Sequence, residues 1–167
     1  HQAFWADQLD RPIIRLTGLV DDTPPGLNPH GYIPAHGDAP IEAIVDAIGT
    51  CFHYSWFAGD GYPYLFTNYG AGSAAAYTGM AHGHYETDGG VWFDPVEDFD
   101  LDRLTVVART DTDWFKHTDA FMRQAVERFG RRVQVSIPDL GGMLDILASL
   151  RTTEKLLVDL IDRPETI

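Results

Sequence analysis

The chain has 167 residues, of which 12 are Lys or Arg and 25 are Asp or Glu, so its formal net charge is −13. Hydrophobic residues make up 44%, which excludes a disordered chain and, at this length, allows one sizeable core. The acidic balance argues against nucleic acid and anionic membrane surfaces as partners. No apolar run approaches the roughly 18 residues of a membrane span. The single cysteine, Cys51, cannot form an internal disulfide and fits a reducing compartment, so we expect a cytoplasmic protein.

The first half of the chain is predicted to hold a short helix over 4–9 and a strand over the β-branched run 13–17. A segment rich in Pro, Gly and His follows over 21–40 and is predicted to be a loop. Apolar residues then recur at helical spacing from 41 to 56, which predicts a long amphipathic helix. Cys51 lies on its apolar stripe, so we expect it to be a small core residue.

The second half alternates short strands with helices. We expect strands over 91–93 and 133–137, a strand or turn over 62–67, and helices over 73–77, 111–129, 143–150 and 153–161. Residues in the 80s show no clear period. The alternation favours the α/β class with parallel strands.

Two segments are similar to known ligand-binding motifs. Gly70-x-Gly72-x-x-Ala75 is similar to a dinucleotide fingerprint, but Pro63 breaks the preceding strand and the following helical stretch is short. We therefore interpret its small residues as a place of close packing. His82-Gly-His84 offers two imidazoles, but no cysteine pair or metalloprotease-type helix accompanies them. We interpret these histidines as solvated loop residues and predict no metal ligands in this chain.

Asp139 directly follows the strand 133–137 and precedes Gly141 and Gly142. In a parallel α/β barrel, residues at the carboxyl ends of strands line the active site, and glycines let the backbone approach a ligand. Asp139 is therefore a candidate catalytic residue, with an equally weighted alternative as a turn or capping residue. Asp145, in the first turns of the next helix, either supports this site or meets the helix dipole; we favour the dipole.

Asp60 ends the first long helical region, where an acidic side chain meets the negative end of the helix dipole. This unfavourable placement makes Asp60 a second catalytic candidate, beside the alternative of a glycine-rich turn. Asn68, Trp92 and Phe93 are weaker candidates for substrate binding, since aromatic residues more often pack than bind.

Four segments together resemble the uroporphyrinogen decarboxylase superfamily, which includes the corrinoid-dependent methyltransferases. They cover residues 5–14, 59–70, 87–93 and, most strongly, 138–165. The resemblance implies a (β/α)8 barrel of which residues 1–167 are the N-terminal portion, with the C-terminal part of the same domain missing. It also matches Asp60 to the substrate-facing aspartate of the family.

The resemblance implies an enzyme, and two branches of the superfamily are open. Nothing here matches the arginine motif with which the decarboxylases contact substrate carboxylates, so we expect a methyltransferase-like member acting with a corrinoid or other methyl donor. Its partners would be a small-molecule or corrinoid substrate and a corrinoid protein. Any zinc would be held by residues of the missing half. The alternatives are decarboxylation of the acetate groups of a tetrapyrrole, with Asp60 stabilising a protonated pyrrole, and a non-catalytic barrel fragment.

Overall fold

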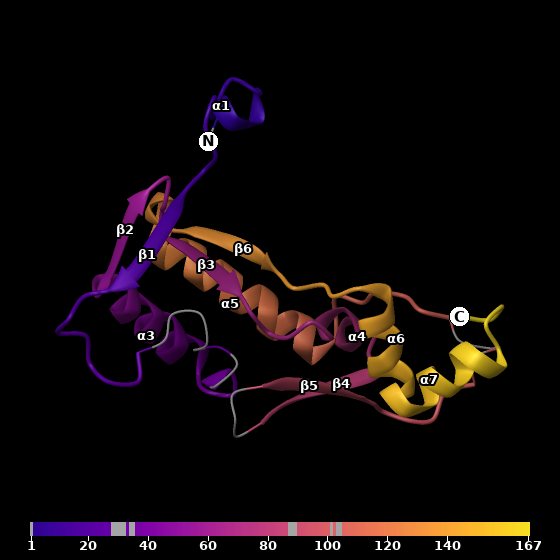
Figure 1. Ribbon diagram of the computed structural model, residues 1–167. Coiled ribbons are helices and arrows are strands. Elements are labelled where there is room, and N and C mark those ends of the chain that lie inside the picture. Colours follow the sequence, from indigo (N-terminus) through magenta and orange to yellow (C-terminus); the bar gives the residue numbers. More distant parts are fainter. Residues whose placement is uncertain (1, 28–32, 34–35, 87–89, 101, 103–104) are drawn as a thin grey trace.

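The computed structural model describes residues 2–27, 33, 36–86, 90–100, 102 and 105–167. Within these residues the chain is mixed α/β, with six α-helices and three two-stranded sheets (Figure 1). The elements in chain order are α1 (Gln2–Trp5), β1 (Arg15–Leu19), α3 (Ile41–His53), β2 (Ser55–Gly59), β3 (Tyr64–Thr67), α4 (Ser73–Tyr77), β4 (Ala81–Tyr85), β5 (Val91–Pro95), α5 (Asp113–Phe129), β6 (Gln134–Pro138), α6 (Met143–Arg151) and α7 (Thr153–Asp162). A 3-10 turn, Gly130–Arg132, joins α5 to β6.

The described strands form three pairs, whose directions the sequence predicts only in part. β3 and β6 are parallel, with Tyr64 opposite Gln134. β1 and β2 are antiparallel, and so are β4 and β5. The mixed α/β class is thus confirmed, whereas the expectation of parallel strands is wrong for two of the three sheets. The described residues form no closed barrel.

Two segments differ from the predicted elements. The helix expected to reach residue 56 ends at His53, because Trp56 enters β2 and pairs with Gly18. The stretch 81–85, for which no element was predicted, is strand β4. His82 and His84 therefore lie on a strand rather than in a loop.

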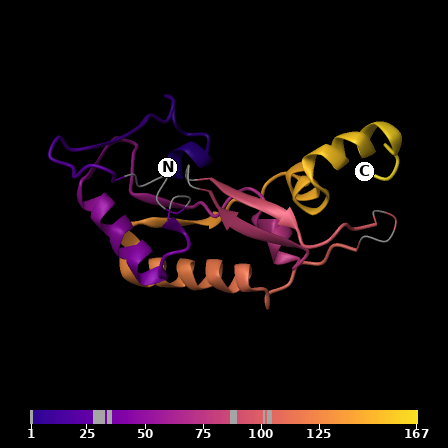
Figure 2. The ribbon, with the colours of Figure 1, turned by 90° about the horizontal axis from the view of Figure 1, so that it is seen from below.

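The main core lies between α3, α5 and the β3–β6 pair (Figure 2). Thr112 caps α5 by accepting a hydrogen bond from the Phe115 amide at 3.2 Å, and the apolar stripe of α5 then packs inward. Phe121 is fully buried there, as is Cys51 on α3, which confirms the core role predicted for the cysteine. Burial also raises the pKa of the Cys51 thiol.

The glycines of the dinucleotide-like motif serve packing. A Cβ atom at Gly72 would lie 2.4 Å from the Phe93 ring, and one at Gly70 would lie 2.9 Å from the same ring. Helix α4, which follows them, has only five residues. The interpretation as close backbone packing is therefore confirmed. No helix among the described residues is long and apolar enough to cross a bilayer.

Candidate functional site

The parallel pair β3–β6 brings two of the candidate residues to one edge. Thr67 pairs with Pro138 at the carboxyl ends of the strands, and the Thr67 hydroxyl donates to the Ser136 carbonyl at 2.8 Å. Asn68 and Asp139 are the next residues along each strand, and both are half-buried. We call this place, formed by Asn68 and by the turn 139–142, the carboxyl edge. It is where ligands bind in parallel α/β folds.

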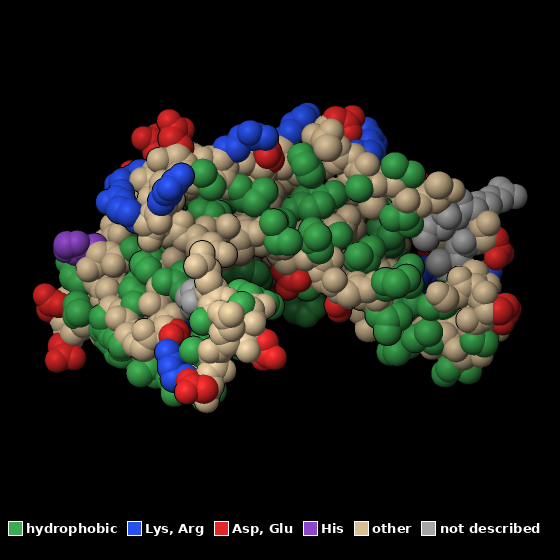
Figure 3. Space-filling model, turned by 90° about the horizontal axis from the view of Figure 1, so that it is seen from above, with side chains coloured by type: hydrophobic (Ala, Val, Ile, Leu, Met, Phe, Trp, Pro, Cys, Tyr) green, Lys and Arg blue, Asp and Glu red, His purple; other side chains and the backbone are tan. Residues whose placement is uncertain are grey.

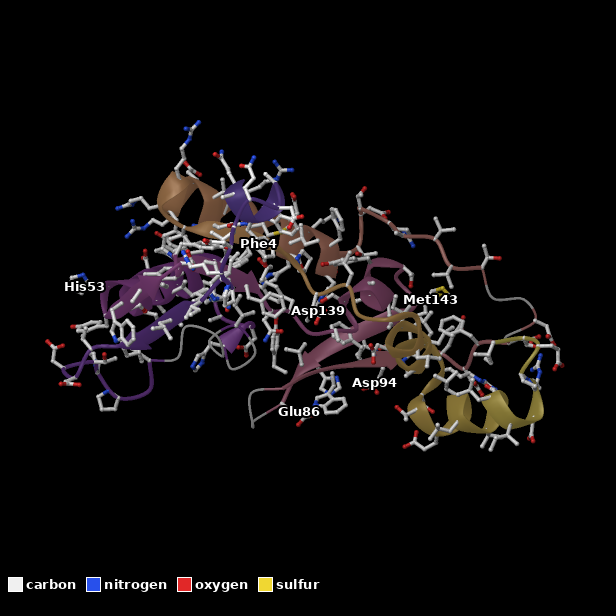
Figure 4. The ribbon with its side chains drawn as sticks, turned by 45° about the horizontal axis from the view of Figure 1, so that its top comes forward. Phe4, His53, Glu86, Asp94, Asp139 and Met143 are labelled. Carbon is white, nitrogen blue, oxygen red and sulfur yellow. The ribbon has the colours of Figure 1, made fainter. Side chains whose placement is uncertain are left out.

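Asp139 holds its own turn in place. Its Oδ1 atom accepts a hydrogen bond from the Gly141 amide at 2.8 Å, which is an Asx-type turn. Gly141 has a φ of +66°, and a Cβ there would lie 2.2 Å from the Ala71 carbonyl oxygen. The turn after β6 thus packs on the loop after β3. Figure 4 shows Asp139 on this turn, ahead of Met143 at the start of α6.

Asp145 serves as a helix-capping residue. Its Oδ2 atom accepts from the Gly142 amide at 2.9 Å, at the N3 position of α6. The carboxylate therefore sits at the positive end of the helix dipole, the alternative that the sequence favoured. Its assignment to substrate stays a prediction.

Trp92 and Phe93 point to opposite faces of β5, as successive strand residues do. Phe93 is buried and its ring packs edge-on against Trp114, with centroids 5.2 Å apart. Trp92 is 62% exposed on the other face. Of these two candidates, Trp92 is the one that a ligand in solution can reach.

Asp60 is bound by an arginine that the sequence did not single out. Arg11 donates to both carboxylate oxygens of Asp60, at 2.7 and 2.9 Å, and the Ile14 amide donates at 3.0 Å. The Arg11 hydrogen bond first, and then the Ile14 amide, hold the pKa of the Asp60 carboxyl well below its usual range. This contact ties the segment before β1 to the turn after β2.

The structure separates Asp60 from Asp139. Asp60 precedes β3 and lines a cavity of about 400 Å³ together with Arg15 and Gln134, the first residue of β6. Asp139 follows β6, so the two carboxylates lie at opposite ends of the strand pair, roughly 10 Å or more apart at about 3.3 Å per residue. The two candidate catalytic carboxylates therefore do not share one site among the described residues, because they flank the strand pair at opposite ends.

Replacing Asp60 with Asn should make the protein less stable near neutral pH and remove part of its acid sensitivity. A carboxyl group with a lowered folded-state pKa stabilises the fold above its unfolded pKa of about 3.9 and loses that contribution as pH falls through the folded value. The difference between wild type and Asp60→Asn in urea unfolding should therefore be present at about pH 6 and shrink toward about pH 2. Glu127→Gln, at an exposed position of α5, is the control and should show no such pattern.

Two arginines near Asp60 escaped the sequence analysis. Arg11 lies 49 positions from Asp60, and no spacing rule connects them. Arg15, whose guanidinium lies 4.3 Å from the centre of the Tyr64 ring, is equally remote in sequence. On β4, by contrast, His82 and His84 alternate with Ala81, Gly83 and Tyr85, a period-2 pattern that could have predicted the strand.

Comparison with known proteins finds no relative of this chain. No family model, no curated protein and no solved structure matches this chain.

Proposed function

We propose that this chain is the N-terminal portion of a barrel enzyme of the uroporphyrinogen decarboxylase superfamily, of the methyltransferase-like branch. The proposal rests on the arrangement of the carboxyl edge. Two hydrogen-bonded parallel strands, β3 and β6, end together and place Asn68 and Asp139 side by side in the chain's topology. In enzymes with parallel barrels, residues from the carboxyl ends of several strands form the active site.

The apolar surface beside this edge supports a larger fold. Ile137, Leu140 and Met143 are 71%, 47% and 78% exposed, although they flank the turn between β6 and α6. Figure 3 shows apolar side chains gathered across the middle of the face that carries β6 and α6. Clustered exposed apolar residues of this kind mark a surface that another part of a protein covers. Further strands and helices of a barrel would cover it.

The charges at the two ends of the strand pair favour the methyltransferase-like branch. Asn68, Asp139 and Asp145 at the carboxyl edge are neutral or acidic, whereas Arg11 and Arg15 lie near Asp60 at the amino end. A tetrapyrrole with many carboxylates needs arginines where it binds, because an acidic edge repels it. A methyl donor or acceptor without many carboxylates does not need arginines where it binds.

In this proposal the chain binds and orients the substrate. The Asn68 amide and the second carboxylate oxygen of Asp139 would hold polar groups of the donor or acceptor. Trp92 pairs with His84 on the outer face of the β4–β5 ribbon and is not part of this edge. The acceptor in this branch would be a thiol. Its thiolate sulfur bonds to the methyl group as the donor–methyl bond breaks, the donor keeps the electron pair of that bond, and the thiol proton goes to solvent. The carboxyl edge itself offers no histidine or cysteine ligand, and the resemblance assigns any zinc of this branch to residues outside this chain.

The test separates the two roles of Asp139. Asp139→Asn keeps a side-chain oxygen that can accept from the Gly141 amide but removes the charge, whereas Asp139→Ala removes both. We expect Asp139→Asn to retain the melting temperature of the wild type and to lower kcat/KM for methyl transfer from methylcobalamin to a thiol by about 100-fold. Loss of the carboxylate charge removes the contact that positions the reactant, and misplacing a bound reactant by about 1 Å lowers the rate by about that factor.

Asp100→Asn, in the acidic loop after β5, is the matched control and should retain the wild-type rate. A wild-type rate for Asp139→Asn combined with a lowered melting temperature for Asp139→Ala would show that Asp139 only holds the turn. Release of carbon dioxide from uroporphyrinogen by the wild type would replace the methyltransferase branch with the decarboxylase branch.

A further inference from the structure

The antiparallel ribbon β4–β5 carries a cluster of metal-binding side chains on its outer face. Its inner face packs on the core: Ala81 and Phe93 are buried, and a Cβ at Gly83 would lie 2.7 Å from the Trp114 ring. Alternation along β4 then places His82 and His84 on the outer face. The register pairs His82 with Asp94 across the ribbon.

The three side chains converge. One ligand atom from each of His82, His84 and Asp94 lies within 4.8 Å of the other two. The Nδ1 atom of His84 is 3.4 Å from the Asp94 Oδ2 atom. Two ligand atoms that are each about 2.1 Å from a tetrahedral ion lie about 3.4 Å apart, so this pair already has the spacing of a zinc site.

A second carboxylate supports His84 from the other side. The Nε2 atom of His84 lies 3.1 Å from Glu86 Oε1, while its Nδ1 atom faces Asp94. A histidine that binds a metal through one ring nitrogen commonly donates its other N–H to a carboxylate, which fixes the tautomer and the ring orientation. Figure 4 labels Asp94 on β5 and Glu86 directly after β4.

We propose that His82, His84 and Asp94 form a binding site for a divalent transition-metal ion, with Zn²⁺ as the best fit and Glu86 as the group that orients His84. Two imidazole nitrogens and one carboxylate favour zinc and its neighbours over Mg²⁺ or Ca²⁺, which prefer oxygen ligands alone. Three protein ligands leave a coordination position for water or another small ligand. The site is separate from the carboxyl edge and does not depend on the proposed methyl transfer.

The test is zinc binding to the purified, metal-stripped protein, measured by equilibrium dialysis and by the absorption spectrum of Co²⁺ as a substitute ion. We expect about one ion per chain and Co²⁺ bands typical of nitrogen coordination. His82→Asn, His84→Asn and Asp94→Asn should each weaken the affinity by at least about tenfold, since loss of even an outer-shell partner costs about 10–100-fold. Glu86→Gln should weaken it less than His84→Asn.

The control is His53→Asn, which removes an exposed histidine at the end of α3 and should leave zinc affinity unchanged. A second measurement needs no variant. Zinc should shift the imidazole NMR signals of His82 and His84 in the wild type and leave those of His53 in place. Zinc that binds equally well to His84→Asn, or that does not shift the His82 and His84 signals, would overturn the proposal.

Discussion

Replacing Phe121 with alanine should lower the free energy of unfolding by about 3–5 kcal/mol, the usual cost of removing a buried phenylalanine. Phe121 is fully buried on α5, and its ring packs edge-on against Tyr69 with centroids 5.5 Å apart. Tyr69 is itself fully buried and touches Trp114, and its hydroxyl lies 3.2 Å from His117 Nε2. The lost ring would therefore leave a cavity where α5 meets the loop that follows β3. Urea unfolding of the purified protein measures the change.

Val126→Ala is the matched control for this prediction. Val126 lies on the same helix but is 54% exposed, so its truncation should change stability by no more than about 0.5 kcal/mol. Equal effects of the two substitutions would mean that α5 does not bury the face assigned to it here.

The second large effect is expected for Gly141→Ala. Gly141 has a φ of +66°, and the added Cβ would lie 2.2 Å from the Ala71 carbonyl oxygen, so the backbone itself has to move. The left-handed conformation alone costs a non-glycine residue about 1–2 kcal/mol, and the displaced turn adds to it. We expect a loss of at least about 2 kcal/mol in urea unfolding, together with an altered position of Asp139.

Gly26→Ala separates the cost of the left-handed backbone conformation from the cost of the steric clash. Gly26 also has a positive φ, +86°, but a Cβ there would meet nothing within 4 Å. Its substitution should cost about 1 kcal/mol, from the backbone conformation alone. If Gly141→Ala cost no more than Gly26→Ala, the loops after β3 and β6 would not be in the close contact described.

The long helices were predictable because their signals are local. The apolar stripe of α3 and the Thr112 cap and apolar stripe of α5 lie within a few turns of the chain, and both helices form close to the expected bounds. Pairing between strands is not local. Nothing in the spacing of β1 and β2 indicates that they run antiparallel, since 35 residues, including α3, separate Leu19 from Ser55.

The candidate site was predictable to a similar extent. Asp139 was placed correctly at the end of a strand, because a strand, a Pro-Asp step and two glycines are adjacent in the sequence. That the strand before Asn68 neighbours β6 is known only from the β3–β6 pairing, which bridges 69 positions between Thr67 and Ser136. The partner of Asp60 was missed for the same reason. Its ion pair with Arg11 gives it a structural contact at the opposite end of the strands.

Hydrogen exchange of the backbone amides, with and without methylcobalamin, tests most directly whether the carboxyl edge is the substrate site. We expect bound methylcobalamin to slow exchange over residues 68–72 and 139–142 and to leave the segment around Asp60 unchanged. Protection confined to the cavity beside Asp60, or no protection in either place, would contradict the assignment of the carboxyl edge as the place where this protein binds its substrate.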